Sequence, residues 1–141
     1  VSGQGGLLDV LLHPDFEKNQ TLFLSYAYRH RNGMTTRVAR AVLDGNQLTD
    51  VDVIFEALPR SGTSRHFAGR MEFDREGNLY VAAGDRGEMD RAQDTGDDAG
   101  GVHRITTGES LPNSSGSVRI VGSLGFVELW QRVGNLEPVG F

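Results

Sequence analysis

The chain has 141 residues, of which 38% are apolar and 23% charged, a composition that fits one globular domain or part of a larger protein. Its net charge of -5 argues against a nucleic-acid-binding surface, which needs clustered lysine and arginine. The sequence has no cysteine, which excludes disulfides, thiolate metal sites and cysteine nucleophiles, and no stretch has the apolar length of a membrane span.

The N-terminal segment, residues 1–6, begins inside a glycine-rich motif without an initiator methionine, a basic leader or an apolar leader. We therefore expect the natural chain to be longer. An apolar run follows at residues 7–12, between glycines and His13-Pro14, and its length and borders favour a buried strand over a helix. Residues 17–20 are expected to turn the chain.

β-Branched and aromatic residues predict three further strands, at residues 21–28, 35–43 and 47–57. A polar loop is expected between the first two, at residues 29–34. Asp44-Gly45-Asn46 joins the last two, because glycine adopts the positive φ values of a tight hairpin. Together with the run at residues 7–12, these segments form a meander of four antiparallel strands.

The same layout restarts after Pro59. Strands are predicted at residues 69–74 and 79–83, joined by a turn. Residues 70–77 repeat the arrangement of residues 8–15, about sixty positions earlier, with a glycine-rich lead, an apolar strand and an aspartate-containing turn. Four-stranded antiparallel units in series predict an all-β fold of the β-propeller class. A β-sandwich, which also uses meanders, is the alternative.

The last third of the chain gives weaker signals. Residues 86–101 are acidic and glycine-rich without apolar periodicity, which predicts a long loop, and a strand is expected at residues 101–106. Two further strands are expected, at residues 118–121 and 126–130. No helix of normal length is expected. We divide the chain into propeller blades at residues 1–106 and a degenerate or truncated start of the next blade at residues 107–141.

His66 is the candidate catalytic residue, because it stands just before a strand, as Gln4 does in the earlier copy. The connections that enter the innermost strands of a propeller form the rim around its axis, so Gln4 and His66 should point into one cavity. An imidazole is suited to removing a hydroxyl proton near neutral pH. Asp85 ends the neighbouring strand, where its carboxylate could bind the other ring nitrogen and fix the tautomer.

Each of these residues also has a structural interpretation. A single histidine beside a Gly-Arg turn is more often a loop or capping residue, and Asp85 alone fits a turn residue that binds backbone amides. Arg70 fits a scaffold contact with carbonyls or a carboxylate, with cofactor contact as the second interpretation. His103, within a strand, is expected to pack rather than bind a metal. The acidic residues between 85 and 98 suggest calcium, but they lack the EF-hand spacing, and a solvated loop is favoured.

Several motifs, in order, resemble those of the glucose/sorbosone dehydrogenase family, also called PQQ-dependent aldose sugar dehydrogenases. They are residues 3–9, 13–16 and 24–26, then 66–70 and 84–87, and finally Gln93-Asp94 with residues 101–105. The resemblance covers residues 3–105. Ala68 stands where the family usually has a second glycine and Gly101 where lysine is common, and the family's Gly-x-Arg-Asn-Pro signature is not intact in residues 128–141.

The resemblance implies a six-bladed propeller, of which this chain would hold about two blades and a remnant. It implies oxidation of the anomeric carbon of aldose sugars to lactones, with His66 taking the hydroxyl proton, hydride passing to PQQ, and an external electron acceptor. Gln4 and Arg70 would bind substrate or cofactor, and the calcium ion that polarises PQQ would be held by ligands outside this chain. The parent protein would be periplasmic or secreted.

Two other functions remain open. A non-enzymatic propeller module could bind protein or glycan. A propeller hydrolase such as a lactonase would need carboxylate and asparagine ligands near the axis, and such a cluster cannot be assembled from these residues. The chain alone is expected to have little activity and to self-associate through its open blade faces, because unpaired apolar faces and strand edges associate.

Overall fold

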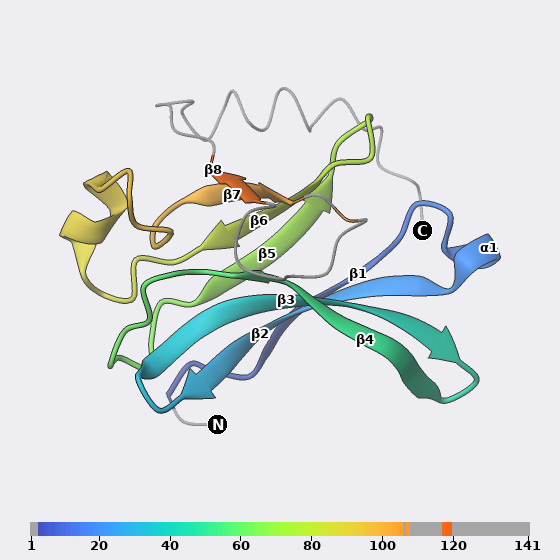
Figure 1. The fold of residues 1–141 in the computed structure, drawn as a ribbon, viewed down its shortest axis with the longest axis horizontal. Helices are drawn as coiled ribbons and strands as arrows, with labels where there is room; N and C mark the ends of the chain where they lie inside the picture. The colour runs from blue at the N-terminus through green and yellow to red at the C-terminus, as the bar shows by residue number, and fades with distance from the viewer. Residues whose placement is uncertain (1–2, 106, 108–116, 120–141) are drawn as a thin grey trace.

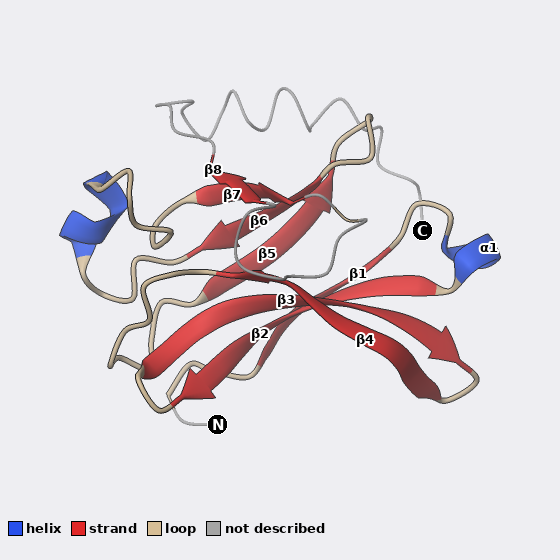
Figure 2. Cartoon of the chain, in the orientation of Figure 1, coloured by secondary structure: helices blue, strands red, loops and turns tan. Residues whose placement is uncertain are grey.

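The computed structural model describes residues 3–105, 107 and 117–119 and shows two four-stranded antiparallel sheets (Figures 1 and 2). The first sheet contains β1 (Leu7–Leu12), β2 (Thr21–His30), β3 (Gly33–Asp44) and β4 (Gln47–Glu56). The second contains β5 (Ala68–Phe73), β6 (Leu79–Ala83), β7 (Val102–Ile105) and β8 (Ser117–Arg119). In each sheet the strands lie in chain order, which is the meander predicted for a propeller blade. We refer to the two sheets as blade 1 and blade 2.

Helical structure in the described ranges is limited to α1 (Phe16–Asn19) and a 3-10 helix, η1 (Met89–Gln93). α1 stands where the sequence predicted a turn. It ends at once because Gln20 is left-handed, with a φ of 52°, and its amide donates to the Phe16 carbonyl at 2.7 Å. η1 lies within the loop predicted at residues 86–101. Neither helix of the described chain has the length and apolarity needed to cross a membrane.

The connection between β2 and β3 differs from the loop predicted at residues 29–34. Strand pairing continues to His30 opposite Gly33, so only Arg31 and Asn32 form the turn. Polar side chains do not interrupt this hairpin, because the backbone supplies the ladder hydrogen bonds while the side chains extend into solvent. The prediction failed because it used polarity as evidence of a loop.

The turn predicted at residues 44–46 is confirmed, with a small change in its limits. Asp44 still pairs with Gln47, so Gly45 and Asn46 form a two-residue turn. Gly45 has a φ of 59°, which is the backbone conformation that the turn requires at its first central position. The strand predicted at residues 79–83 also matches β6 residue for residue.

The C-terminal part of the prediction is only partly within the described residues. β8 pairs with β7 as the fourth strand of blade 2 and overlaps the strand predicted at residues 118–121. The strand predicted at residues 126–130 lies outside the described residues. The division of the chain at residue 107 stays a prediction.

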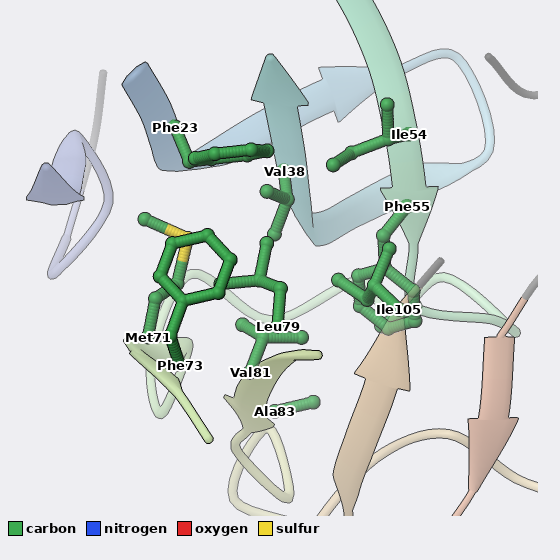
Figure 3. Close-up of a cluster of buried hydrophobic side chains, with 11 residues drawn as sticks. Phe23, Val38, Ile54, Phe55, Met71, Phe73, Leu79, Val81, Ala83 and Ile105 are labelled. Atoms are coloured by element: carbon green, nitrogen blue, oxygen red, sulfur yellow. The ribbon is translucent and has the colours of Figure 1, made fainter. Parts of the chain in front are cut away.

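The main core lies between the two blades, as Figure 3 shows. Blade 1 contributes Phe23, Val38, Ile54 and Phe55, together with Ala57 directly after β4, and blade 2 contributes Met71, Phe73, Leu79, Val81, Ala83 and Ile105. Along β6 the buried side chains alternate with half-buried ones, as the period of a strand requires. Full burial of one large apolar side chain contributes about 1.5–3 kcal/mol to the free energy of folding. Burial of this layer is therefore the main interaction that holds the two blades together.

His103 belongs to this core and confirms the predicted packing role. Its side chain is fully buried, and its ring centroid lies 4.9 Å from that of Phe55. Its Nε2 lies 2.8 Å from the carbonyl oxygen of Asp98, which is the acceptor that a buried imidazole N–H requires.

Polar contacts between the blades fix the position of β5. The Ser25 hydroxyl donates to the carbonyl of Gly69 at 2.6 Å, and the Thr36 hydroxyl donates to the carbonyl of Phe67 at 2.7 Å. The amide of Met71 donates to the carboxylate of Asp9 at 2.8 Å. These bonds are buried or half-buried and run from blade 1 to the backbone at and just before β5. They therefore fix the position of the start of β5 relative to blade 1.

The β5–β6 turn leads to a testable prediction about Asp74. Its carboxylate accepts hydrogen bonds from the amides of Glu76 and Asn78, the Asn78 side chain and the Tyr80 hydroxyl, at 2.7–3.0 Å. Burial alone would raise the pKa of Asp74, but these hydrogen bonds together lower it. Replacing Asp74 by alanine in the full-length protein is expected to reduce the free energy of unfolding by roughly 1–2 kcal/mol at neutral pH.

The pH dependence gives the check. Since the pKa of Asp74 is lower in the folded protein, its contribution is present above the unfolded pKa of about 4 and is lost as the pH falls through the folded pKa. Urea unfolding of wild type and Asp74→Ala should therefore differ clearly near neutral pH and converge under acid conditions. A difference that is the same at both pH values would contradict the prediction.

Candidate functional site

The candidate site lies where the β4–β5 connection meets the start of the β6–β7 connection. The amide of Gly84 donates to the carbonyl of Phe67 at 3.1 Å, and the amide of Arg86 donates to that of His66 at 3.4 Å. Three non-glycine residues here have left-handed backbones, His66 at a φ of 52°, Ala68 at 56° and Arg86 at 62°. Such conformations are uncommon outside glycine and often mark functional sites.

His66 and Asp85 form a hydrogen-bonded pair. Nδ1 of His66 lies 2.8 Å from Oδ1 of Asp85, and the same oxygen accepts the amide of Gly87 at 2.8 Å. The Gly87 amide first, and then His66, lower the pKa of the Asp85 carboxyl, so it is ionised at neutral pH. Because a carboxylate only accepts hydrogen bonds, Nδ1 carries the proton of the neutral imidazole, which leaves the lone pair on Nε2.

The exposure of the pair suits it to act on a ligand. The His66 side chain is 51% exposed and that of Asp85 is 25% exposed. Among the described residues, Nε2 of His66 has no hydrogen-bond partner. An imidazole with Nδ1 bound to a carboxylate and Nε2 open to a ligand has the arrangement of a general base and the carboxylate that orients it.

Gln4, which precedes β1 of blade 1, lies next to His66. Its side-chain oxygen accepts the amide of His66 at 2.9 Å, and its own amide donates to the carbonyl of Ser64 at 2.9 Å. Gly3 makes this approach possible, since a Cβ there would overlap Ser64. The structure therefore brings together Gln4, His66 and Asp85, while their roles stay predictions. The Gln4 amide nitrogen, in an exposed side chain, is left available to a ligand.

Arg70 is not part of this group. Its side chain is 80% exposed, and its guanidinium lies 3.9 Å from the carboxylates of Asp9 and Glu72. This is the scaffold contact that the sequence suggested as the first interpretation. No described contact joins Arg70 to His66 or Asp85, and its role in binding substrate or cofactor stays a prediction.

Two residues that the sequence analysis did not single out complete the local structure. Gly84 lies so close to the His66 peptide that a Cβ at this position would overlap the His66 carbonyl oxygen. Arg86 is 4% exposed and lies with its guanidinium over the ring of Phe67. The only available signal was their position on either side of Asp85 in the motif at residues 84–87.

The acidic loop is more ordered than the solvated loop that we predicted. Asp97 is buried and forms an ion pair with Arg91 at 2.6 Å, and Asp98 accepts the amide of Leu58 at 2.8 Å. Glu88 accepts the hydroxyl of Ser61 at 2.7 Å. Asp98 and Glu88 thus hold the β6–β7 connection against the β4–β5 connection, while the Asp97–Arg91 pair lies within the β6–β7 connection. Within residues 3–105, no group of three or more histidine, aspartate or glutamate side chains is placed to hold a metal ion.

Comparison with known proteins places the chain in a family. The family model for Glucose / Sorbosone dehydrogenase matches residues 1–122. The aldose sugar dehydrogenase YliI of Escherichia coli is 33% identical over 131 residues, which cover 91% of this chain and 35% of that protein. An uncharacterized protein of Synechocystis sp. is 42% identical over 87 residues, which cover 62% of this chain and 21% of that protein.

Solved structures share the fold. A glucose dehydrogenase has a TM-score of 0.73 at 34% identity, covering 79% of this chain and 33% of its own. A PQQ-bound aldose sugar dehydrogenase from Streptomyces coelicolor has a TM-score of 0.65 at 28% identity, covering 80% of this chain and 34% of its own. This chain spans about a third of the length of the relatives that it matches. The chain, with its two four-stranded propeller blades, belongs to the glucose/sorbosone dehydrogenase family.

Proposed function

We propose that the full-length protein oxidises the anomeric carbon of aldose sugars to lactones with PQQ as the hydride acceptor. The observation that carries this proposal is the His66–Asp85 pair, with a free and exposed Nε2. Membership of the family supports the reaction class, and the PQQ-bound relative supports the cofactor. We also propose a periplasmic or secreted location for the full-length protein, as the family resemblance implies.

The residues of this chain would supply the proton transfer. Nε2 of His66 takes the proton of the anomeric hydroxyl, and the ionised Asp85 stabilises the imidazolium that forms. When bound, PQQ supplies the acceptor for the hydride that leaves the anomeric carbon, so proton and hydride together account for the two-electron oxidation. Gln4 holds the His66 backbone through its oxygen and can donate its amide to a sugar hydroxyl or a quinone oxygen.

The described residues fit one side of such a site. An exposed imidazole and an exposed amide offer one acceptor and one donor for a polar ligand, which suits a sugar and a quinone. They do not offer a calcium cage, since no cluster of three acidic or histidine side chains is present within the described ranges. We therefore assign the calcium ligands, and the further cofactor-binding residues, to the rest of the full-length protein.

Reconstitution tests the proposal. The full-length protein, incubated with PQQ and calcium, is expected to oxidise aldoses in a dye-linked assay and to release the lactone. The same assay on this 141-residue chain is expected to give little or no turnover, because most of the relatives' length is missing from it. If the loaded full-length protein binds sugar or glycan without oxidising it, a non-enzymatic binding module becomes the better assignment.

A further inference from the structure

We propose that Arg86 is a positioning residue that holds the backbone on both sides of His66 and so aims the imidazole at the substrate. This inference rests on the proposed function of His66 as a base. Arg86 lies in the β6–β7 connection, directly after Asp85, and His66 lies in the β4–β5 connection. Arg86 thus joins the segment that carries the Asp85 carboxylate to the segment that carries the His66 imidazole.

The side chain of Arg86 contacts both neighbours of His66. Its Cζ lies 3.6 Å from the centroid of the Phe67 ring, a cation–π stack, and its Nη1 donates a long hydrogen bond of 3.4 Å to the carbonyl of Arg65. The residue is only 4% exposed. A planar guanidinium that is buried and stacked in this way has little freedom, so it restricts the rotation of the peptide units on either side of His66.

The backbone of Arg86 holds the same segment. Its amide donates to the carbonyl of His66 at 3.4 Å, and its carbonyl accepts the hydroxyl of Thr63 at 2.6 Å. His66 itself has a left-handed backbone, which is uncommon for a residue other than glycine and which surrounding contacts stabilise. Arg86 contacts the chain at positions 63, 65, 66 and 67 and so adds to the bonds that Gln4, Asp85 and Gly84 make to this segment.

Stability does not explain why this residue is charged. Within the described ranges the Nη2 of Arg86 is buried without a hydrogen-bond partner. Burial first, and then the nearby charge of Arg91, lower the pKa of Arg86 to about 10. A buried charge with incomplete partners is less favourable than an apolar side chain of the same size. The geometry that the guanidinium imposes on His66 is the benefit that offsets this cost.

The test compares Arg86→Met, Arg86→Lys and Arg86→Ala in the full-length protein, with Arg31→Met in the exposed β2–β3 turn as the matched control. We expect Arg86→Met to stay folded and to lose about 10–100-fold in kcat with little change in KM, as a small misplacement of a catalytic group does. Arg86→Lys should not restore the rate, because an ammonium cannot stack or donate as the planar group does. Added guanidinium should partly rescue Arg86→Ala.

A readout without turnover separates this inference from the proposed function. In proton NMR the Nδ1–H of His66, shared with Asp85, should give a downfield resonance that is absent from His66→Gln. We expect Arg86→Met to shift or broaden this resonance, whereas Arg31→Met leaves it unchanged. An unaltered resonance together with wild-type kcat would overturn the inference. If wild type shows the resonance but never oxidises sugars, the proposed function fails while the effect on the resonance still decides the role of Arg86.

Discussion

Replacing His66 by glutamine in the full-length protein is expected to lower kcat for aldose oxidation by about 10²–10⁴-fold, the range that a general base contributes. Glutamine fills a similar volume and can hydrogen-bond to Asp85, but it cannot take a proton at neutral pH. Because His66 is half exposed and lies outside the core, the variant should keep the unfolding midpoint of wild type. Steady-state kinetics with PQQ and calcium, alongside thermal unfolding, measures both quantities.

Two further variants make this experiment specific. Asp85→Asn is expected to give a smaller but clear loss of kcat, because an amide can donate to Nδ1 and so favour the tautomer with its proton on Nε2. His30→Gln, at the exposed end of β2, is the matched control and should behave as wild type. A His66→Gln protein that retains wild-type kcat would remove the base assignment, whatever the outcome at Asp85.

Replacing Gly84 by alanine is expected to be the most disruptive single change for both folding and activity. The added Cβ would overlap the carbonyl oxygen of His66, which is backbone and cannot rotate away as a side chain can. The two connections would have to separate, which would break the hydrogen bond from Gly84 to Phe67 and move His66 away from Asp85. We expect a loss of about 3 kcal/mol or more in the free energy of unfolding, together with loss of kcat in the protein that remains folded.

Gly62→Ala is the control for this prediction. Gly62 lies in the β4–β5 connection, has no positive φ, and has open space around the position of an added Cβ. Its replacement should leave the unfolding midpoint and kcat close to those of wild type, because alanine meets no steric obstacle there. If Gly84→Ala and Gly62→Ala unfold at the same temperature, the two connections are not packed as the structure shows.

Much of the fold follows from local patterns in the sequence. The apolar and aromatic run at residues 79–83 predicted the limits of β6, and Gly45 predicted the β3–β4 turn, because both depend on neighbours within a few residues. The repeat of a strand layout then predicted blades. Local polarity misled at α1, at the β2–β3 hairpin and in the acidic loop, where Asp98 and Glu88 have partners distant in sequence.

By itself the sequence determined which residues could form the site, since Gln4, His66 and Asp85 stand at strand ends of a predicted propeller. Only the tertiary structure decided how His66 is held. Ser25 and Thr36, in blade 1, donate hydrogen bonds to the backbone at the start of β5, and Arg86 stacks on Phe67, the residue after His66. No local pattern marks these polar residues as buried, because their burial results from packing against segments 21 to 44 residues away.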